Sequence, residues 1–329
     1  MTTTETSLQD AGTSAAATPG SRVVRIGTRA SALARTQSTT VADLLTERTG
    51  LVTELVPIST HGDVSREPLA QMGGTGVFVS ALRDALLRGE VDLAVHSLKD
   101  LPTAPPEGIA LAAVPPREDP RDVVVARDGL TLGELPQGAT VGTGAPRRVA
   151  QIEALGLGVQ LVGIRGNVDT RIAKVRDGEL DAVVLARAGL NRLGRVEEAT
   201  EVLDPIQVLP APGQGALALE CRADDDLVAI VATALDDAPT RACVTVERVL
   251  LAELEAGCSA PVGALAEVAM GEVGDELWVR AVALSPDGTL AVRRSAAGPL
   301  DDPVALGRSL AAEMLADGAA DLISERPAT

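Results

Sequence analysis

Short runs rich in Val and Ile alternate with amphipathic stretches up to about residue 186 of this 329-residue chain. Such alternation is typical of strands and helices in α/β folds. The runs predict strands at 23–27, 52–60, 91–95, 122–127, 139–143, 159–164 and 180–186. The stretches between them predict helices at 29–48, 77–87, 146–155 and 167–177. The pattern therefore predicts an α/β fold.

The pattern restarts near residue 120, and two echoes indicate two similar lobes. Residues 26–28, IGT, and residues 141–143, VGT, each end a predicted strand and open a helix. The segment 89–95, GEVDLAV, also resembles the segment 178–184, GELDAVV. Repeats this short also arise by chance, so the echoes favour two lobes without requiring them.

A different composition begins near residue 238 and predicts a small α+β domain. It follows a Pro/Gly turn and a strand at 210–222, and this strand is expected to return to the first lobe. The later elements are a helix to about 255, strands near 262–269, 276–284 and 289–296, and a helix at about 302–317. A chain of this length usually exceeds what one core supports. We therefore predict a tail at 1–20, domain 1 at 21–117 and 214–235, domain 2 at 118–213, and domain 3 at 236–329.

The first 20 residues contain acidic side chains and no apolar segment, so they predict a disordered tail rather than a signal peptide. No stretch approaches the roughly 18 uninterrupted apolar residues of a membrane span. The three cysteines, Cys221, Cys243 and Cys258, fit no zinc-site spacing, and only two His could add ligands. Because so few cysteines are present, and in an odd number, we expect a reducing cytoplasm.

Aromatic side chains are scarce, with one Phe, one Trp and no Tyr in the whole chain. Stacking platforms for single-stranded nucleic acid are therefore excluded, and the net charge of −17 also argues against a polyphosphate partner. Trp278 lies in an alternating strand and is expected in the core of domain 3. Lysine is nearly as rare, since only Lys99 and Lys174 stand among 29 basic residues.

Arginines gather at three predicted strand-to-helix junctions. Arg29 follows the first strand, Arg147 and Arg148 follow residues 139–143, and Arg165 precedes a helix that carries Arg171 one turn later. A helix N-terminus already presents free N–H groups and the positive end of the helix dipole, so added cations favour a bound anion there. The alternative is a set of surface arginines that are solvated or paired with the abundant carboxylates.

Two further segments carry residues that could do chemistry. Lys99 and Asp100 follow the strand 91–95 in a stretch expected to be non-helical, where they form either a solvated ion pair or a partly buried acid/base group. Cys258 lies between Gly257 and Ser259 in a tight loop after a helix. Such a cysteine is more accessible than a structural one and could carry a covalent group.

Nine segments then match one known family in order. They are IGTRASALA, THGD, GGTGVF, AVHSLKDLP, REDPRD, VGTGAPRR, RGNVDTR, LPAPGQGALALE and GCSAPVG. Together they resemble the porphobilinogen deaminase family, also called the hydroxymethylbilane synthase family. The resemblance covers residues 22 to about 318.

The resemblance implies two lobes like those of periplasmic binding proteins, followed by a small C-terminal α+β domain. It implies a monomeric, cytoplasmic transferase that deaminates porphobilinogen and joins four molecules of it head to tail. The chain would hold the polypyrrole intermediates on a dipyrromethane cofactor and release hydroxymethylbilane for the biosynthesis of heme-type tetrapyrroles. We expect no metal, no membrane and no nucleic acid as a partner of this chain.

The resemblance also assigns roles to individual residues. Asp100 matches the catalytic carboxylate, and Cys258 matches the residue that holds the cofactor by a thioether. The other residues expected to contact the cofactor are Ser97, Lys99, Arg147, Arg148 and Phe78. The residues expected to bind the acetate and propionate groups of the substrate are Arg29, Ser31, Arg165 and Arg171.

The chain departs from common family patterns at four positions. Gly144 and Ala145 stand where members often have serines, and Gln71 and Thr75 replace lysines that some members have. A rival interpretation is an anion-binding, solute-sensing module on the same two-lobed fold. It would explain the arginines, but it gives no role to Cys258 or to the third domain.

Overall fold

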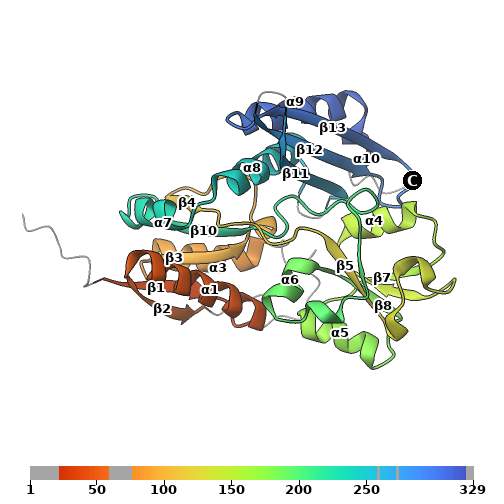
Figure 1. The fold of residues 1–329 in the computed structure, drawn as a ribbon, viewed down its shortest axis with the longest axis horizontal. Coiled ribbons are helices and arrows are strands. Elements are labelled where there is room, and N and C mark those ends of the chain that lie inside the picture. Colours follow the sequence, from red (N-terminus) through yellow and green to blue (C-terminus); the bar gives the residue numbers. More distant parts are fainter. Residues whose placement is uncertain (1–21, 59–75, 258–259, 272–273, 324–329) are drawn as a thin grey trace, which may run out of the picture.

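The computed structural model describes residues 22–58, 76–257, 260–271 and 274–323. In this part of the chain, two five-stranded sheets form two lobes and a three-stranded sheet forms a third unit (Figure 1). The sheet of lobe 1 has the order β2 (Val52–Pro57), β1 (Val23–Thr28), β3 (Leu93–Ser97), β10 (Leu217–Arg222) and β4 (Ile109–Ala113). The sheet of lobe 2 has the order β7 (Gln160–Val162), β6 (Thr140–Gly142), β8 (Ala182–Ala186), β5 (Asp122–Ala126) and β9 (Glu201–Val202).

The two lobes have the same topology. In lobe 1, β1 pairs in parallel with β2 and β3, while β10 lies antiparallel between β3 and β4. In lobe 2, β6 pairs in parallel with β7 and β8, while β5 lies antiparallel between β8 and β9. The predictions of two similar lobes and of a strand that returns to the first lobe are therefore confirmed.

The sequence echoes occupy equivalent places in the two sheets. Ile26 of β1 is opposite Leu93 of β3, and Val141 of β6 is opposite Ala182 of β8. The segments 89–95 and 178–184 thus enter their sheets in the same register. The resemblance between these short segments reflects structural equivalence and not chance.

The segments 89–95 and 178–184 each contain an aspartate that ties two parallel strands together. The Oδ2 atom of Asp92 accepts a hydrogen bond from the backbone N–H of Arg25 at 3.0 Å. The Oδ2 atom of Asp181 accepts one from the backbone N–H of Thr140 at 2.7 Å. In both lobes this bond fixes the start of the strand that leads toward the other lobe.

Helices cover both faces of each sheet. Those of the lobes are α1 (Ala32–Thr49), α3 (Gly76–Leu87), α4 (Pro146–Ala154), α5 (Val168–Arg176), α6 (Arg187–Arg192) and α7 (Leu227–Leu235). In lobe 1, α1 and α7 pack on one face of the sheet and α3 packs on the other. The first of these begins at Ala32 and not at residue 29, because the side chain of Ser31 accepts the N–H of Ala34 and caps the helix.

The third unit is a sheet with helices on one face. Its strands are β11 (Val262–Met270), β12 (Asp275–Leu284) and β13 (Ala291–Pro299), and its helices are α8 (Ala238–Glu253), α9 (Pro303–Ala316) and α10 (Ala319–Ile323). The expectation that Trp278 lies in the core is wrong. The alternation of β12 buries Leu277 and Val279 and turns Trp278 to the opposite face, where it is 38% exposed. The guanidinium of Arg280 lies 4.7 Å from its ring centroid.

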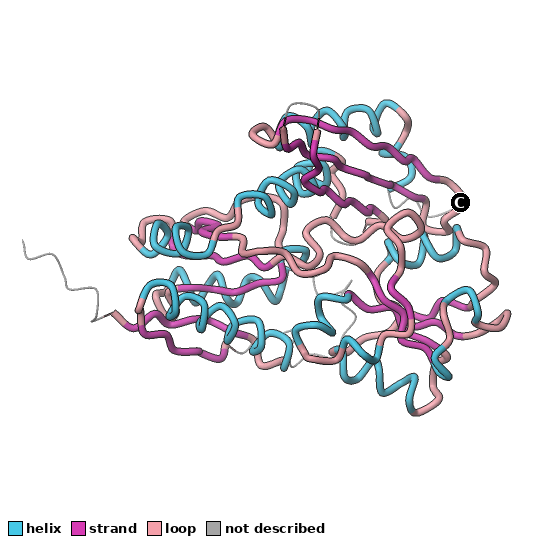
Figure 2. Tube along the Cα trace, viewed as in Figure 1, coloured by secondary structure: helices cyan, strands magenta, loops and turns pink. Residues whose placement is uncertain are grey.

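Two irregular connections join the lobes, one at 114–121 and one at 203–216 (Figure 2). Both are tied to the third unit by Glu247, a fully buried carboxylate of α8. It binds the guanidinium of Arg117 at 2.7 and 3.0 Å and accepts the N–H of Gly213 at 2.6 Å. The third unit therefore fixes the crossing points of the chain between the lobes.

Several details differ from the sequence-based expectations. Strand β3 continues to Ser97, and Leu98–Asp100 form a 3-10 turn, so the expected non-helical conformation is wrong there. The elements that the pattern missed are β4, β9, α6, α7 and α10. The predicted tail lies outside the described residues, and the domain bounds stay a prediction. Among the described helices, none is both long enough and apolar enough to cross a membrane.

Candidate active site

The predicted site residues gather where parallel strands of both lobes end. Ser97 ends β3, and Lys99 and Asp100 lie in the 3-10 turn that follows it. Arg147 and Arg148 lie in the first turn of α4, after β6. Carboxyl ends of parallel strands are where α/β folds place their ligands. Cys258, Gln71 and Thr75 lie outside the described residues, and Phe78 falls in α3 with its side chain outside the described part.

A buried arginine pair shares one carboxylate in lobe 2. Arg147 donates to Oδ2 of Asp122 and Arg148 donates to Oδ1, both at 2.8 Å, and all three residues are at most 4% exposed. Burial alone would raise the pKa of Asp122, but the two guanidinium charges outweigh it and hold that pKa well below its usual range. Because two cations face one anion, the group keeps a net positive charge.

Gln214 connects this pair to lobe 1. Its side-chain N–H donates to Oδ1 of Asp122 at 2.8 Å, and its Oε1 accepts from Nζ of Lys99 at 3.2 Å. Burial, together with the nearby charge of Arg148, lowers the pKa of Lys99 to about 8. The partner of the Lys99 ammonium in this bond is a neutral amide, which leaves its charge available to an anion.

A fourth cation, Arg171 of α5, lies beside the pair. Burial and the charge of Arg148 both lower the pKa of Arg171. Its Nε donates to the carbonyl of Gly166 at 2.9 Å, which holds the side chain at the start of the helix. The structure thus brings Lys99, Arg147, Arg148 and Arg171 together, and we call these four residues the cationic cluster.

The other predicted substrate contacts lie at neighbouring junctions. Arg29 is half-buried between β1 and α1, Ser31 caps α1, and Arg165 is exposed just after β7. The side chains of Leu33 in α1 and Val168 in α5 both approach Gly189 of α6. The N-terminal ends of α1 and α5 therefore face each other across the two lobes, although these three residues are not part of the cationic cluster.

The sequence reasoning missed two residues that organise the site, Asp122 and Gln214. Both lie in segments that carry the family resemblance, REDPRD and LPAPGQGALALE. Asp122 could have been found as a carboxylate at the start of an otherwise apolar strand, where burial requires a cationic partner. Gln214 carries no such signal, because its role depends on both lobes meeting at one point.

Among the described residues, the cationic cluster has more positive than negative charge. Asp122 is its buried counter-charge, and the Nε atom of Arg148 is buried with no hydrogen-bond partner in this part of the chain. A ligand with several carboxylates would supply both acceptors and charge, and guanidinium groups bind carboxylates with two parallel hydrogen bonds. The residues present therefore fit a polycarboxylate cofactor or substrate.

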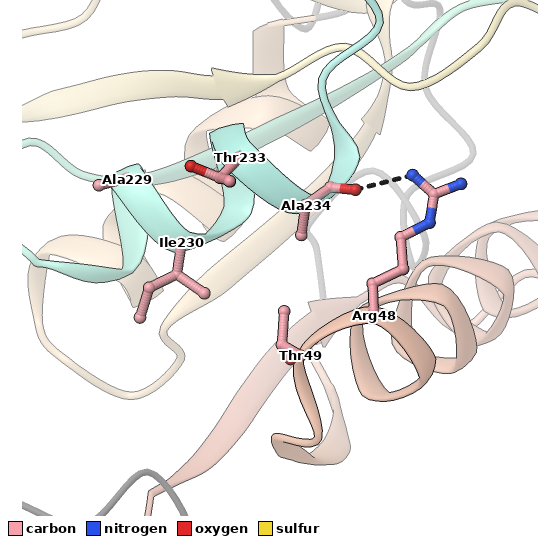
Figure 3. Close-up of a pocket in the computed structure, with 6 residues that line it drawn as sticks. All are labelled: Arg48, Thr49, Ala229, Ile230, Thr233 and Ala234. Atoms are coloured by element: carbon pink, nitrogen blue, oxygen red, sulfur yellow. Dashed lines mark hydrogen bonds between the residues drawn. The ribbon is translucent and has the colours of Figure 1, made fainter.

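The hollow drawn in Figure 3 is a separate feature. It lies between the end of α1 and α7, with Arg48 donating to the carbonyl of Ala234 at 2.7 Å. Because α1 rises about 1.5 Å per residue, its C-terminal end is roughly 25 Å from Ser31 at its start. This hollow is therefore remote from the predicted substrate contact at Ser31.

Comparisons with known proteins identify the family. The family description "Porphobilinogen deaminase, dipyromethane cofactor binding domain" matches residues 24–229, and "Porphobilinogen deaminase, C-terminal domain" matches residues 241–316. The chain belongs to the porphobilinogen deaminase family. Proteins named porphobilinogen deaminase 1 from Streptomyces coelicolor and Streptomyces avermitilis are 60% and 62% identical to it, over 93% of this chain and 98% of each relative.

Further relatives agree with this membership. The porphobilinogen deaminase of Mycobacterium tuberculosis is 56% identical over 92% of this chain and 98% of its own length. Among solved structures, the methionine binding protein MetQ covers 64% of this chain and 89% of its own, with 12% identity and a TM-score of 0.43. The cofactor of the porphobilinogen deaminase family is a dipyrromethane. The excess of positive charge in the cationic cluster fits the carboxylates of such a cofactor.

Proposed function

We propose that this chain deaminates porphobilinogen and joins four molecules of it head to tail, releasing hydroxymethylbilane for tetrapyrrole biosynthesis. The observation that carries the proposal is the cationic cluster, which spans both lobes and places four cations around one buried carboxylate, Asp122, in a chain of net charge −17. Each pyrrole unit brings two carboxylates, so the growing product is a polyanion. Arginines concentrated in one place let an acidic protein hold such a product.

Each group of residues has a proposed part in binding. Arg147, Arg148 and Lys99 hold the carboxylates of the dipyrromethane, together with Ser97 and Phe78. A second set, at the facing helix starts, binds the incoming substrate: Arg29, Ser31, Arg165 and Arg171. We propose Cys258 as the attachment point, since its thiol can form a thioether. When bound, the dipyrromethane supplies the free α-carbon to which the first substrate is joined.

Asp100 has the proposed catalytic role. When the C–N bond of the substrate's protonated aminomethyl group breaks, its electron pair leaves with the nitrogen as ammonia, and the positive charge that the ammonium carried spreads over the ring onto the pyrrole nitrogen. A carboxylate placed beside that N–H stabilises the charge and can take up or return its proton. The 3-10 turn after β3 places Asp100 next to Lys99, beside the cationic cluster.

The remaining parts of the proposal concern organisation. We propose the domain bounds 21–117 with 214–235, 118–213 and 236–329, with a monomer that acts in the cytoplasm and takes no nucleic acid. The three sheets and the two connections at 114–121 and 203–216 support these bounds.

Intact-protein mass spectrometry combined with a turnover assay tests the function. The purified wild-type protein should exceed its sequence mass by two pyrrole units, give colour with Ehrlich reagent, and consume porphobilinogen. The variant Cys258→Ser should have its bare sequence mass, while Cys243→Ser, which replaces a buried thiol of α8, should keep the added mass. A wild-type protein with bare mass and no turnover would instead favour an anion-binding module.

A further inference from the structure

Helix α8 of the third unit reaches lobe 1 through two arginines on one side of the helix. Arg241 and Arg248 are seven residues, or about two helical turns, apart. Each donates hydrogen bonds to backbone carbonyls of lobe 1. Their targets differ, since Arg241 reaches the strand β4 and Arg248 reaches the turn that carries Asp100.

The guanidinium of Arg248 donates hydrogen bonds to the backbone just beyond that turn. Its Nη1 donates to the carbonyl of Leu101 at 3.1 Å, and its Nη2 donates to the carbonyl of Pro102 at 2.7 Å. The carbonyl of Leu98, at the start of the turn, lies 3.5 Å from Nη1. These carbonyls lie on both sides of Asp100 in the sequence, so the contacts of Arg248 restrain the backbone before and after the proposed catalytic residue.

The segment 98–102 has a separate anchor at its first residue. Leu98 is fully buried, and its N–H donates to the carbonyl of Ala216 at 3.0 Å. The following residues leave the sheet and include a proline, which cannot donate a backbone hydrogen bond. Arg248 therefore restrains the end of the segment that the sheet does not hold.

The helix that carries Arg248 is itself firmly placed. The preceding residue, Glu247, is fully buried and binds Arg117, Gly213 and the backbone N–H of Ala266. An arginine projecting from this point has a base that is tied to both interlobe connections. Its guanidinium can thus act as a fixed clamp rather than a mobile surface charge.

We propose that Arg248 is a positioning residue for the reaction, which holds Asp100 in place by clamping the backbone of residues 98–102. It acts through the backbone and does not touch the substrate. The inference rests on the proposed function, in which Asp100 stabilises charge on the pyrrole ring. Misplacement of a catalytic group by about 1 Å can cost up to about a hundredfold in rate.

The test compares Arg248→Met with Arg241→Met in purified protein that carries its cofactor. Methionine keeps the apolar part of the side chain and removes every donor. Arg241 is the matched control, because it makes an ion pair with Asp236 and donates to the carbonyl of Ala112, away from the turn. Both variants should lose thermal stability, so kcat and KM are measured well below the unfolding midpoint of each.

We expect Arg248→Met to lower kcat about tenfold or more, with KM within about twofold and the cofactor mass unchanged. Arg241→Met should keep the wild-type kcat. Equal kcat values for the two variants, per folded molecule, would overturn the inference. If Arg248→Met does not fold, Arg248→Lys replaces it, since lysine lacks the planar pair of nitrogens with which the guanidinium meets the carbonyls of Leu101 and Pro102. A lower kcat at unchanged KM in Arg248→Lys supports the clamp, and an unchanged kcat overturns it.

Failure of the proposed function gives a different result. In that case the wild-type protein itself shows no turnover of porphobilinogen. A wild-type protein that turns over, beside an Arg248 variant that is equally fast, leaves the function standing and removes only the clamp.

Discussion

Within the described strands of lobe 1 the buried carboxylate is Glu220, in the middle of β10, whereas within those of lobe 2 it is Asp122, at the start of β5. Glu220 binds Arg83 of α3 at 2.7 and 2.9 Å and lies 3.3 Å from Nε2 of His96. Burial alone would raise its pKa, but the hydrogen bond from Arg83 and the neighbouring His96 lower it to about 2. Each sheet therefore buries one carboxylate within its described strands, beside cationic partners and at a different position along the strand. Asp92 of lobe 1 is buried too, but it precedes β3.

The pairing registers show that the two positions have been exchanged. By the pairing of β3 with β10 and of β8 with β5, Glu220 corresponds to Val125, and Asp122 corresponds to Leu217. Lobe 2 thus has an apolar residue where lobe 1 has its charge, and the reverse. The two sheets share a strand order, but each places its ion pair independently.

The two buried carboxylates hold their arginines in places that suit different functions. The carboxylate in the middle of β10 holds Arg83 against the face of the lobe 1 sheet. The carboxylate at the start of β5 holds Arg147 and Arg148 where the lobes meet, next to Lys99. In the proposed function, lobe 2 therefore supplies most of the anion-binding residues, while the equivalent end of lobe 1 carries the turn with Lys99 and Asp100.

The largest expected effect comes from removing the carboxylate of Asp100, which is the proposed catalytic group of lobe 1. Asp100→Asn keeps the shape of the side chain but removes the negative charge that stabilises the electron-poor pyrrole. We expect kcat to fall by a factor of about 10² to 10⁴ while the cofactor mass stays unchanged. Steady-state kinetics and intact mass on one preparation check this. Near-wild-type turnover would remove Asp100 from the mechanism and leave lobe 1 without its proposed task.

The next effect compares the two buried carboxylates directly. Asp122→Asn leaves two buried guanidinium groups without counter-charge, whereas Glu220→Gln leaves only one guanidinium, that of Arg83, which is partly exposed. Removing one partner of a buried ion pair costs about 3–5 kcal/mol of unfolding free energy. We expect Asp122→Asn near the upper end of this range and Glu220→Gln near the lower end, measured by urea denaturation.

The two variants should also differ in how the bound cofactor changes their loss of stability. Bound carboxylates can replace part of the charge lost in Asp122→Asn, so its loss of stability should be smaller in cofactor-bearing protein than in a Cys258→Ser background. The loss in Glu220→Gln should be the same in both backgrounds. An equal dependence on the cofactor for the two variants would contradict the separation of tasks.

A smaller effect tests the equivalence of the lobes at one backbone position. Gly27, the next-to-last residue of β1, and Gly142, the last residue of β6, occupy equivalent positions, and a Cβ atom at either would crowd a neighbouring side chain. At Gly142 the nearest atoms are 2.7 Å away in Leu180 and 2.9 Å away in Ile164, whereas at Gly27 the nearest is 2.9 Å away in Leu82.

Overpacking of this kind costs about 1–3 kcal/mol of unfolding free energy. Both Gly27→Ala and Gly142→Ala should therefore destabilise the protein, with Gly142→Ala the more costly because two side chains must move. Thermal unfolding with a Gly133→Ala control, where a Cβ would meet open space, measures this. A larger loss at Gly27 than at Gly142 would show that the lobes accommodate crowding differently.

Much of the fold could be predicted from the sequence because it depends on local pattern. Alternation of apolar runs located the long elements, and the echo GEVDLAV/GELDAVV located equivalent strands, since the same aspartate bond recurs in both. Trp278 shows the limit of the method. Its strand was predicted, but which face meets the helices depends on packing that no window of residues contains.

The site could be predicted only as far as its residue types. The family resemblance named Lys99, Arg147, Arg148 and Arg171, which the structure brings together. The residues that connect them were not found, because Gln214 lies 92 residues from Asp122 in the sequence and the contact between them needs both lobes. Bridges between lobes leave no periodic signal, so they emerge only from the assembled chain.

The smallest expected effect compares the two lysines, one in each lobe. Burial lowers the pKa of Lys99 to about 8, below the value of about 10.4 in an unfolded chain. Between these pH values the unfolded chain binds a proton that the folded chain has lost, so this group makes the unfolding free energy rise with pH. Lys174 instead pairs with Glu179 in an exposed position.

We therefore expect the unfolding free energy of wild type minus that of Lys99→Met to rise by on the order of 1 kcal/mol from pH 8 to pH 10. Lys174→Met should show no such rise, and comparison with it removes the slopes of groups common to both variants. Carboxylates of a bound cofactor favour the charged ammonium, so the rise should be larger in a Cys258→Ser background. A difference that falls with pH would show that the Lys99 ammonium is charged and already paired with a carboxylate of the chain. The binding of the cofactor's carboxylates would then fall to Arg147, Arg148 and Arg171 of lobe 2 alone.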